Sequence, residues 1–407
     1  MRMIMKKEIL ANLRFPEFSK SYWGITRLNV LADKITERNK DDSIKRVFTN
    51  SATEGVIDQE EYFDRNIANK NNLTNYFVVE KGDYVYNPRI STTAPVGPIS
   101  KNKLGIGVMS PLYTVFRFRN KENDFYEHFF LTNLWHVYIK NLSNTGARHD
   151  RITISVDNFM KMPLPYASPE EQQKIADCLS SIDDLIDAES RKLKALEKYK
   201  KGLMQKLFPA EGKTLPEWRF PEFRGKSEWR IKPLGKICTN YDSRRIPITE
   251  KDRVKGEIPY IGASGVIDYI NDFIFDEDLL CVSEDGANLV ARTYPIAFSI
   301  SGKTWVNNHA HVLKFSHKYT QDIVESYLNM INLQDFLTGM AQPKLNRAKL
   351  DIIPIPLPEE EEQQKIADCL SEVDKIITEQ SNKLEQLKAH KKGLMQGLFP
   401  SLEEADV

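Results

Sequence analysis

The segment EQQKIADCL occurs twice in this chain, at residues 171–179 and again at residues 362–370. A second segment, Arg-Phe-Pro-Glu-Phe, also occurs twice, at residues 14–18 and 219–223. The first match continues in the same register through 202–205 with 393–396 and through 207–209 with 398–400. The long stretches between these segments show no visible match. Because a repeat constrains the architecture before any local pattern does, we predict two similar modules with different contents.

A long helix is predicted in each copy, because apolar residues recur there at alternating spacings of three and four. This is the a and d pattern of a coiled coil. The predicted helix-pair seam is Ile175, Leu179, Ile182, Ile186, Leu193 and Leu196 in the first copy, and Ile366, Leu370, Val373, Ile377, Leu384 and Leu387 in the second. At a rise of 1.5 Å per residue, about 35–40 residues make a helix roughly 50–60 Å long.

Neither helix can bury its seam alone, and the nearest partner is the other copy. Both seams are interrupted at equivalent places, by Glu189 and Gln380 and then by Lys200 and Lys391. The heptads alone leave the direction of pairing open. We predict an intramolecular antiparallel coiled coil with pseudo-twofold symmetry, because the seams and their interruptions match. The alternative is two unrelated surface helices that each pack on their own domain.

The modules between the repeated segments have the patterns of a mixed α/β (α+β) fold with many short strands. Alternating residues predict strands at 84–86, 115–119, 279–282 and 311–315, and short helical patches are predicted at 124–142 and 320–337. Turn-rich polar loops separate these elements, and such loops are where binding specificity tends to lie.

Composition narrows the class of protein. The 407 residues include 57 Lys and Arg against 57 Asp and Glu, which argues against wholesale non-specific binding of polyanions. The four cysteines show no C-x-x-C spacing, so we expect free thiols and neither a zinc ribbon nor a disulfide framework. No apolar run has the length of a membrane helix and the start has no signal-like segment, so a cytoplasmic location without membrane contact is predicted.

Side chains suited to base edges and phosphates gather in the loops of both modules. Arg or Lys reads guanine, Asn or Gln reads adenine, and Ser or Thr reads either. The predicted DNA-binding residues are Arg38, Lys40, Asn87, Arg89, Ser91, Thr92, Lys101, Lys103, Arg148 and His149 in the first module, and Ser264, Asn288, Lys303, Trp305, Asn307, Asn308, His309, Gln342, Lys344 and Asn346 in the second. For any single residue, the alternative is an ordinary polar position on the surface.

No catalytic motif is found. Two Gly-Lys-Thr triplets, at 212–214 and 302–304, lack the glycine five positions earlier that a phosphate-binding loop requires. His309 and His311 share a strand face but have no further ligand at metal-binding spacing, which favours a structural or DNA-facing role. Asn87-Pro88-Arg89-Ile90 only faintly resembles the Asn-Pro-Pro-Tyr/Phe loop of adenine methyltransferases. We therefore expect no catalytic residue, no metal site and no cofactor in this chain.

The doubled framework resembles the specificity subunits of type I restriction-modification systems over the whole chain. The resemblance rests on a proline-rich approach, then Glu-Gln-Gln-Lys-Ile-Ala, then a long helix that closes in Gly-Leu-Met-Gln-x-Leu-Phe-Pro. Family members commonly carry residues like Trp305-Val306-Asn307-Asn308-His309 and Gly339-Met340-Ala341-Gln342, which the second module matches. The first module departs from this pattern, with residues 144–149 near the second place and no Trp-x-Asn-Asn-His.

This resemblance implies a non-catalytic subunit in which each module is a target-recognition domain for one half of a bipartite double-stranded DNA sequence. The helix pair would set the gap between the half-sites and dock two modification (methyltransferase) subunits for adenine methylation. Two restriction/translocase subunits would add ATP-dependent cleavage. S-adenosylmethionine, ATP and Mg are expected on those partners. The expected segments are recognition domain 1 (1–163), helix 1 (164–212), recognition domain 2 (213–354) and helix 2 (355–407).

Two readings from other classes compete with DNA recognition. One is a coiled-coil scaffold that binds proteins through its two variable modules. The other is a stand-alone methyltransferase with a degenerate motif, which would have to bind S-adenosylmethionine by itself. Because phosphate contacts make DNA affinity fall steeply with salt, a salt titration of DNA binding separates the first of these from DNA recognition.

Overall fold

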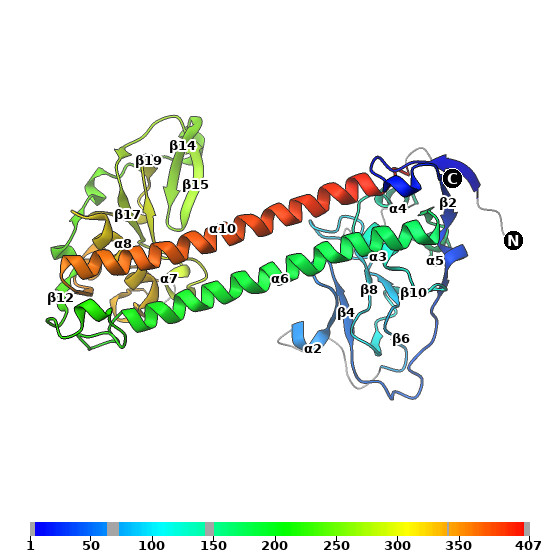
Figure 1. The fold of residues 1–407 in the computed structure, drawn as a ribbon, viewed down its shortest axis with the longest axis horizontal. Helices are drawn as coiled ribbons and strands as arrows, with labels where there is room; N and C mark the ends of the chain where they lie inside the picture. The colour runs from blue at the N-terminus through cyan, green and yellow to red at the C-terminus, as the bar shows by residue number, and fades with distance from the viewer. Residues whose placement is uncertain (1–4, 63–72, 143–149, 340–341, 403–407) are drawn as a thin grey trace. The chain divides into compact units, whose positions relative to one another are not determined.

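The computed structural model describes residues 5–62, 73–142, 150–339 and 342–402. The chain forms two compact units, one of Met1–Ala188 with Lys383–Val407 and the other of Glu189–Asn382. Two helices of 39 residues each, α6 (Pro169–Leu207) and α10 (Glu360–Leu398), contribute one part to each unit (Figure 1). The four segments predicted from the sequence have boundaries set by the repeat, whereas the two units are defined by their internal contacts. The boundaries of the four segments therefore stay a prediction.

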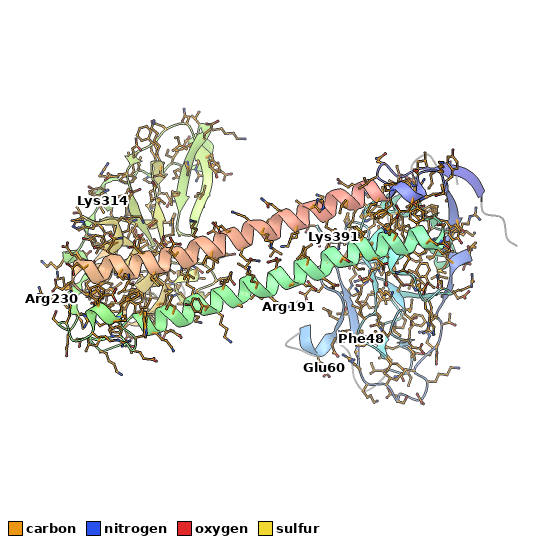
Figure 2. All side chains as sticks on the ribbon, in the orientation of Figure 1. Phe48, Glu60, Arg191, Arg230, Lys314 and Lys391 are labelled. Atoms are coloured by element: carbon orange, nitrogen blue, oxygen red, sulfur yellow. The ribbon has the colours of Figure 1, made fainter. Side chains whose placement is uncertain are left out.

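In the first unit the beginning of α6 lies against the end of α10. Ile175 and Leu179 of α6 share a buried cluster with Leu398 of α10. Lys391 of α10, visible in Figure 2, forms an ion pair with Asp183 of α6 at 2.5 Å. Since an early position of one helix contacts a late position of the other, the two helices run in opposite directions here.

The second unit holds the equivalent contacts with the helices exchanged. Lys200 of α6 pairs with Asp374 of α10 at 2.5 Å, and these two residues are the repeat equivalents of Lys391 and Asp183. Gln380 Nε2 donates to the Glu189 carboxylate at 2.6 Å, so the two matched interruptions of the seam bind each other. The predicted antiparallel pairing is confirmed, and every predicted seam residue is buried or half-buried.

The module of the first unit is built on a four-stranded antiparallel sheet with the order β3-β10-β7-β8. Tyr84 and Tyr86 of β7 point into the core that contains α3 and the two long helices, whereas Val85 points into a second core on the other face. The strand is therefore buried on both faces, which the Tyr-Val-Tyr pattern allows because strand side chains alternate. A three-stranded sheet β1-β2-β11 connects the module to α6.

The elements of this unit, in chain order, are β1 (Met5–Ile9), η1 (Pro16–Phe18), β2 (Trp23–Arg27), α1 (Leu28–Leu31), β3 (Ala32–Lys34), β4 (Phe48–Ser51), β5 (Gly55–Asp58), α2 (Gln59–Tyr62), β6 (Phe77–Val79), β7 (Tyr84–Tyr86), β8 (Ile99–Lys101), β9 (Gly107–Met109), β10 (Thr114–Phe118), α3 (Asp124–Phe130), α4 (His136–Leu142), α5 (Val156–Met160) and β11 (Pro163–Tyr166). The pairs β4-β5 and β6-β9 form two further antiparallel ribbons.

The second module repeats this plan although its sequence does not match. Its sheet β13-β20-β17-β18 has the same order of equivalent strands. Leu280 and Val282 of β17 enter the core shared with the long helices, and Leu279 and Cys281 enter the core on the other face. A mixed sheet β15-β14-β19-β16, in which β14 and β19 run parallel, replaces the two small ribbons of the first module.

The elements of the second unit are η2 (Pro221–Phe223), β12 (Arg230–Pro233), η3 (Leu234–Lys236), β13 (Thr239–Asn240), η4 (Asp242–Arg244), η5 (Glu250–Asp252), β14 (Lys255–Gly262), β15 (Gly265–Ile270), β16 (Phe275–Asp276), β17 (Leu279–Ser283), α7 (Asn288–Ala291), β18 (Ala297–Ile300), β19 (Lys303–Val306), β20 (Ala310–Lys314), α8 (Lys318–Met330), η6 (Gln334–Phe336), α9 (Arg347–Asp351) and β21 (Pro354–Leu357). The predicted strands and helical patches are confirmed, and each predicted patch is broken into two helices.

Candidate nucleic-acid interface

The loop after β7 presents several predicted DNA-binding residues of the first module on its surface. Arg89, Ser91 and Thr92 are exposed, and the loop is ordered because the backbone groups of Ser91 and Ala94 hydrogen-bond to each other at 3.1 and 3.2 Å. Gly97 closes the loop with a positive φ of 80°, and a Cβ at this position would lie 1.9 Å from the Asn87 carbonyl oxygen. Only glycine fits this turn, so the loop has a defined shape with an exposed polar edge.

Asn87 has an internal role and not an exposed one. Its Nδ2 donates to the Asn50 carbonyl at 2.9 Å, and its Oδ1 accepts from the Arg89 backbone N–H at 3.0 Å. The side chain is buried and its amide is already hydrogen-bonded on both sides. Asn87 thus shapes the loop, and its predicted direct contact with DNA stays a prediction.

The remaining positions of the first module fall into different environments. Lys40 is exposed, and Arg38 lies half-buried with its guanidinium 4.0 Å from the centre of the Phe77 ring. Arg148 and His149 lie outside the described residues.

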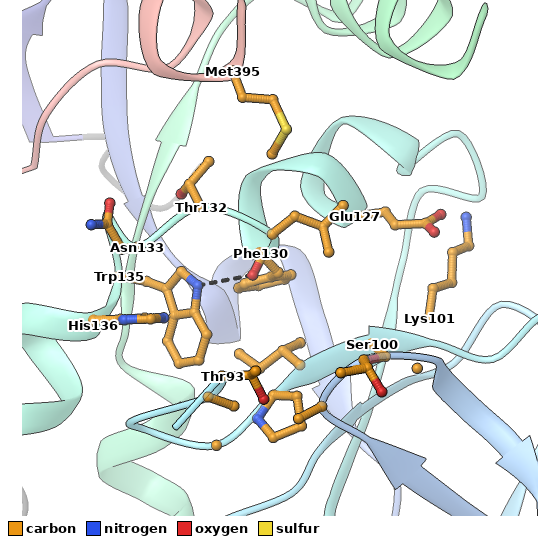
Figure 3. A pocket seen from close by; sticks show the side chains of 18 of the residues that line it. Thr93, Ser100, Lys101, Glu127, Phe130, Thr132, Asn133, Trp135, His136 and Met395 are labelled. Atoms are coloured by element: carbon orange, nitrogen blue, oxygen red, sulfur yellow. Dashed lines mark hydrogen bonds between the residues drawn. The ribbon is translucent and has the colours of Figure 1, made fainter. Parts of the chain in front are cut away.

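Lys101 and Lys103 line a cavity of about 890 Å³ between this module and the last turns of α10 (Figure 3). Aromatic side chains form part of the wall, and the Trp135 indole donates to the Phe130 carbonyl at 3.1 Å. Lysines of α10 complete the basic part of the lining, namely Lys388, Lys391 and Lys392. These three lysines could not be identified as lining residues from the sequence, because only the fold brings α10 next to this module.

Both module lysines in the cavity are already paired with carboxylates. Lys101 lies 2.5 Å from Asp124, and Lys103 lies 2.6 Å from Glu127. Burial opposes the charge of Lys103, but the hydrogen bond and charge of Glu127 outweigh it and raise the pKa of the lysine. A DNA phosphate at this place would therefore compete with Asp124 and Glu127 for these two lysines.

In the second module, three segments far apart in the sequence meet at one place: residues 284–286, 307–309 and 342–345. The Glu284 N–H donates to the His309 carbonyl at 2.9 Å, and the Leu345 N–H donates to the Glu284 carbonyl at 2.8 Å. The Gly286 N–H donates to the Pro343 carbonyl at 3.2 Å. The two motifs around Asn307 and Gln342 are thereby joined through residues 284–286.

At this meeting point the neighbours Asn307 and Asn308 differ. Asn307 is buried, and its Oδ1 accepts from the His309 backbone N–H at 2.8 Å, whereas Asn308 is exposed. Trp305 is also buried, with its indole N–H donating to the Ile246 carbonyl at 2.6 Å. The polar groups of Trp305 and Asn307 already have partners inside the protein, and the predicted DNA contacts of these two residues stay predictions.

Four predicted residues remain exposed around the meeting point: Asn308, His309, Gln342 and Lys344. The His309 ring lies 2.9 Å from the Asp285 carboxylate, and Lys344 exchanges backbone hydrogen bonds with Thr338 at 2.8 Å. These four side chains form a cluster that can face a ligand, and we call it the module 2 cluster.

The module 2 cluster rests on a buried charged network. His311 Nδ1 lies 2.6 Å from the Asp242 carboxylate, and its Nε2 lies 2.7 Å from the Leu345 carbonyl. Arg245 adds a second charge, bound to Glu284 at 2.7 Å. Burial disfavours the imidazolium, but Asp242 outweighs burial and raises the pKa of His311. The ring links Asp242 to the Leu345 carbonyl and so fastens the 342–345 segment to the sheet.

Four other predicted positions of the second module lie outside these three segments. Asn288 exchanges two hydrogen bonds of 3.0 Å with the Tyr294 backbone, and Asn346 caps α9 by accepting from the Lys349 N–H at 3.0 Å. Ser264 is exposed at the turn between β14 and β15, and Lys303 is exposed 4.7 Å from the Phe273 ring centre. Asn288 and Asn346 thus have local structural partners, while Ser264 and Lys303 stay available to a ligand.

Within the described ranges, no group of three or more His, Cys, Asp or Glu side chains is arranged to hold a metal ion. None of the helices described there combines the length and apolar character needed to cross a bilayer. The four cysteines are free, with Cys281 buried and the others half-buried.

The chain is similar to proteins of one known family. The family model "Type I restriction modification DNA specificity domain" matches the chain twice, over residues 29–198 and 226–389. A putative type I restriction enzyme specificity subunit of Haemophilus influenzae is 33% identical over 153 residues, which cover 38% of this chain and 39% of that protein. The putative MjaX specificity subunit of Methanocaldococcus jannaschii is 26% identical over 68% of each chain.

The solved structures support the fold alone, because their sequence identity is low. The crystal structure of a type I restriction-modification S subunit from M. genitalium has a TM-score of 0.62 at 13% identity and covers 96% of this chain and 99% of that one. A chain from a study of complex assembly and conformational transition in the type I system has a TM-score of 0.55 at 15% identity, covering 92% and 96%.

Proposed function

Because this chain belongs to the family of type I restriction modification DNA specificity domains, we propose that it is the DNA-recognition subunit of a type I restriction-modification complex. Each module reads one half of a bipartite double-stranded target. The observation that carries the proposal is the doubled framework: the same sheet order and helix contacts occur in both units, while the exposed polar loops differ. Such an arrangement presents two different reading surfaces in one chain.

The direct readers are the exposed residues that the loops hold in a defined shape. In the second module the Asn308 and Gln342 amides can pair with adenine, and Lys344 can pair with guanine or a phosphate. In the first module Arg89, Ser91 and Thr92 take this part. The buried histidine and asparagine side chains beneath these loops hold the loop backbone, so that the readers reach the groove without a large loss of entropy on binding.

The helix pair sets the gap between the two half-sites and docks two modification subunits. These subunits bring S-adenosylmethionine and methylate adenine, and two restriction subunits bring ATP, Mg and cleavage. This chain itself is non-catalytic. That role is supported by Asn87, the residue most like a methyltransferase loop asparagine, whose amide is already occupied by backbone groups.

Mapping of methylated adenines tests this function. The chain is expressed with its modification subunits in a host free of other adenine methylation, and the same subunits without the chain serve as control. We expect methylation at one bipartite sequence with a constant gap, seen only when the chain is present. An identical methylation map without the chain would contradict the proposal.

DNA binding by the complex gives a second readout. The affinity for the mapped sequence is expected to fall steeply and linearly on a logarithmic scale of salt concentration, because Lys and Arg release counterions from phosphates. If the affinity for DNA did not change with salt while the chain still bound its protein partners, a protein-binding scaffold would be favoured.

A further inference from the structure

The repeated Arg-Phe-Pro-Glu-Phe segment has the same set of contacts in each unit. In the first unit Arg14 binds Glu171 of α6 through two nitrogens, Nε at 2.9 Å and Nη2 at 2.7 Å. Only 9% of the Arg14 side chain and 1% of the Glu171 side chain are exposed, so the pair is nearly shut off from water. Arg14 also donates to Ser21 Oγ at 2.8 Å, which ties the pair to the start of the module.

The second unit reproduces these contacts with the repeat equivalents. Arg219 binds Glu362 of α10 through Nε at 2.7 Å and Nη2 at 2.6 Å. Their side chains are 11% and 2% exposed. Arg219 also donates to the Lys226 and Ser227 carbonyls at 3.1 Å, so the module is tied to the pair here too.

A second, outer contact accompanies each buried pair. Glu17 lies 3.4 Å from Lys174, and Glu222 lies 3.5 Å from Lys365. The same lysines lie over the phenylalanine of the segment, 5.6 Å from the Phe15 ring centre and 5.8 Å from that of Phe220.

The residue before each segment reaches the end of the other long helix. The Leu13 N–H donates to the Gly397 carbonyl of α10 at 2.8 Å, and the Trp218 N–H donates to the Lys206 carbonyl of α6 at 2.9 Å. Gly397 lies so close that a Cβ there would meet the Leu13 side chain at 2.9 Å. One short segment therefore holds the start of one helix and the end of the other, at the point where the chain enters a module.

We propose that these two clamps, Arg14 with Glu171 and Arg219 with Glu362, are positioning residues that hold each recognition module at one angle on the helix pair. This inference rests on the proposed function. A fixed angle is needed because the helices can set the gap between half-sites only if the modules do not swing on them. A bidentate Arg–carboxylate pair suits this task, since its geometry is directional and a single ammonium contact is not.

The test uses the complete methyltransferase complex and a set of duplexes whose half-sites are fixed and whose gap varies by one base pair. The variant is Arg14→Met with Glu171→Gln, which removes the directional contact without leaving one buried charge unpaired. Arg119→Met with Asp33→Asn is the control, because it removes an exposed bidentate Arg–Asp pair of the same module whose hydrogen bonds go to β3 and α1 and not to the long helices.

We expect the wild-type complex and the control to methylate only the native gap. The clamp variant should also methylate at gaps one base pair shorter and longer. The ratio of methylation at these gaps to methylation at the native gap should rise about tenfold, with both half-site sequences unchanged. The charge-swapped pair Arg14→Glu with Glu171→Arg should restore part of the selectivity. The outer pair variant Glu17→Gln with Lys174→Gln, which removes only exposed charges, should show a weaker broadening even if the buried variant assembles poorly.

Unchanged gap selectivity in a folded complex of the clamp variant, or in the outer pair variant where the former does not assemble, would overturn the proposal. Failure of the proposed function looks different, because then the wild-type complex would show no bipartite methylation at any gap.

Discussion

The two units share their contacts with the long helices but differ in the polar groups buried inside their modules. The clamps, the Lys–Asp pairs and the sheet order repeat from one unit to the other. The buried histidines do not. The contacts that repeat are those to helices of nearly the same sequence. Of the two buried histidines, His128 faces Ser180 of α6, whereas His311 lies against the 342–345 segment proposed to read DNA. The parts of the chain whose sequence repeats thus form the framework, and the proposed DNA-reading loops lie in the parts whose sequence does not repeat.

The buried histidines show the contrast most clearly. His128 of the first unit lies on α3 with its Nε2 3.1 Å from Ser180 Oγ, and burial lowers its pKa to about 4, helped by the charge of Lys391. His311 of the second unit bonds an acidic partner and a carbonyl, and its pKa is raised. Burial thus favours the neutral ring of His128, whereas the Asp242 carboxylate favours the protonated ring of His311.

The largest expected effect tests the shared framework. Arg14→Ala and Arg219→Ala each leave a nearly buried glutamate without its partner, so each should destabilise its unit by about 3–5 kcal/mol. We expect the two costs to agree closely because the contact distances agree. Urea unfolding followed by hydrogen exchange in each unit measures them, with Arg119→Ala as an exposed control. A large cost in one unit and none in the other would break the equivalence of the clamps.

The second prediction concerns the pH dependence of the two histidines, which should have opposite signs. His128 binds a proton more weakly when folded, so its contribution is present above pH 6.5 and is lost as the pH falls toward 4, by up to about 3 kcal/mol. His311 binds a proton more strongly when folded. Its contribution is present below pH 6.5 and is lost as the pH rises through its raised pKa.

Each ring has its own charged neighbours, which must stay unchanged in these experiments. They are Asp183, Lys391, Lys103 and Asp124 around His128, and Asp242 and Glu284 around His311. The stability of His128→Gln and His311→Gln is compared with that of the wild type between pH 5 and 9. The cost of His128→Gln should shrink toward pH 5, and that of His311→Gln should shrink toward pH 9. If the stability losses of the two variants changed in the same direction with pH, the proposed opposite behaviour of the two histidines would be contradicted.

The smallest expected effects separate readers from supports in the second module. Asn308→Ala and Gln342→Ala should each weaken DNA binding by about 1–3 kcal/mol and relax the preference at one base pair, without loss of stability. Asn307→Ala should instead lower stability, because the His309 N–H then loses its acceptor. Binding to duplexes with single base changes, together with thermal unfolding, distinguishes the two outcomes. If Asn307→Ala and Asn308→Ala had the same effects on DNA binding and on stability, the distinction between reader and support would be contradicted.

The sequence predicted the framework better than the site, for physical reasons. Heptad spacing is local, so the seam around Ile175 and Leu384 could be read directly, and matched interruptions indicated the direction of pairing. That Glu189 and Gln380 bind each other could not be read, because it depends on the register between helices. The Arg14–Glu171 clamp joins residues 157 positions apart, and no local pattern encodes such a contact.

The site was harder because neighbouring residues can face opposite ways. Asn307 and Asn308 are identical in type, and only the turn that joins Asn307 to the His309 N–H decides which of them is exposed. Asn87 is a further example, because its amide is hydrogen-bonded inside the loop next to the exposed Arg89. Residue type indicates what a side chain can bind, whereas the fold decides whether it is already bound inside the protein.

The central claim is that the helix pair sets the gap between two half-sites. Seven residues inserted after Ser190 and seven after Ser381 lengthen both helices next to the facing residues Glu189 and Gln380 and keep the heptads in phase. Such an insertion adds about 10 Å of helix, which matches about three base pairs of duplex. We predict methylation at the same two half-site sequences with a gap about three base pairs wider. A complex that folds and methylates at the original gap would contradict this account.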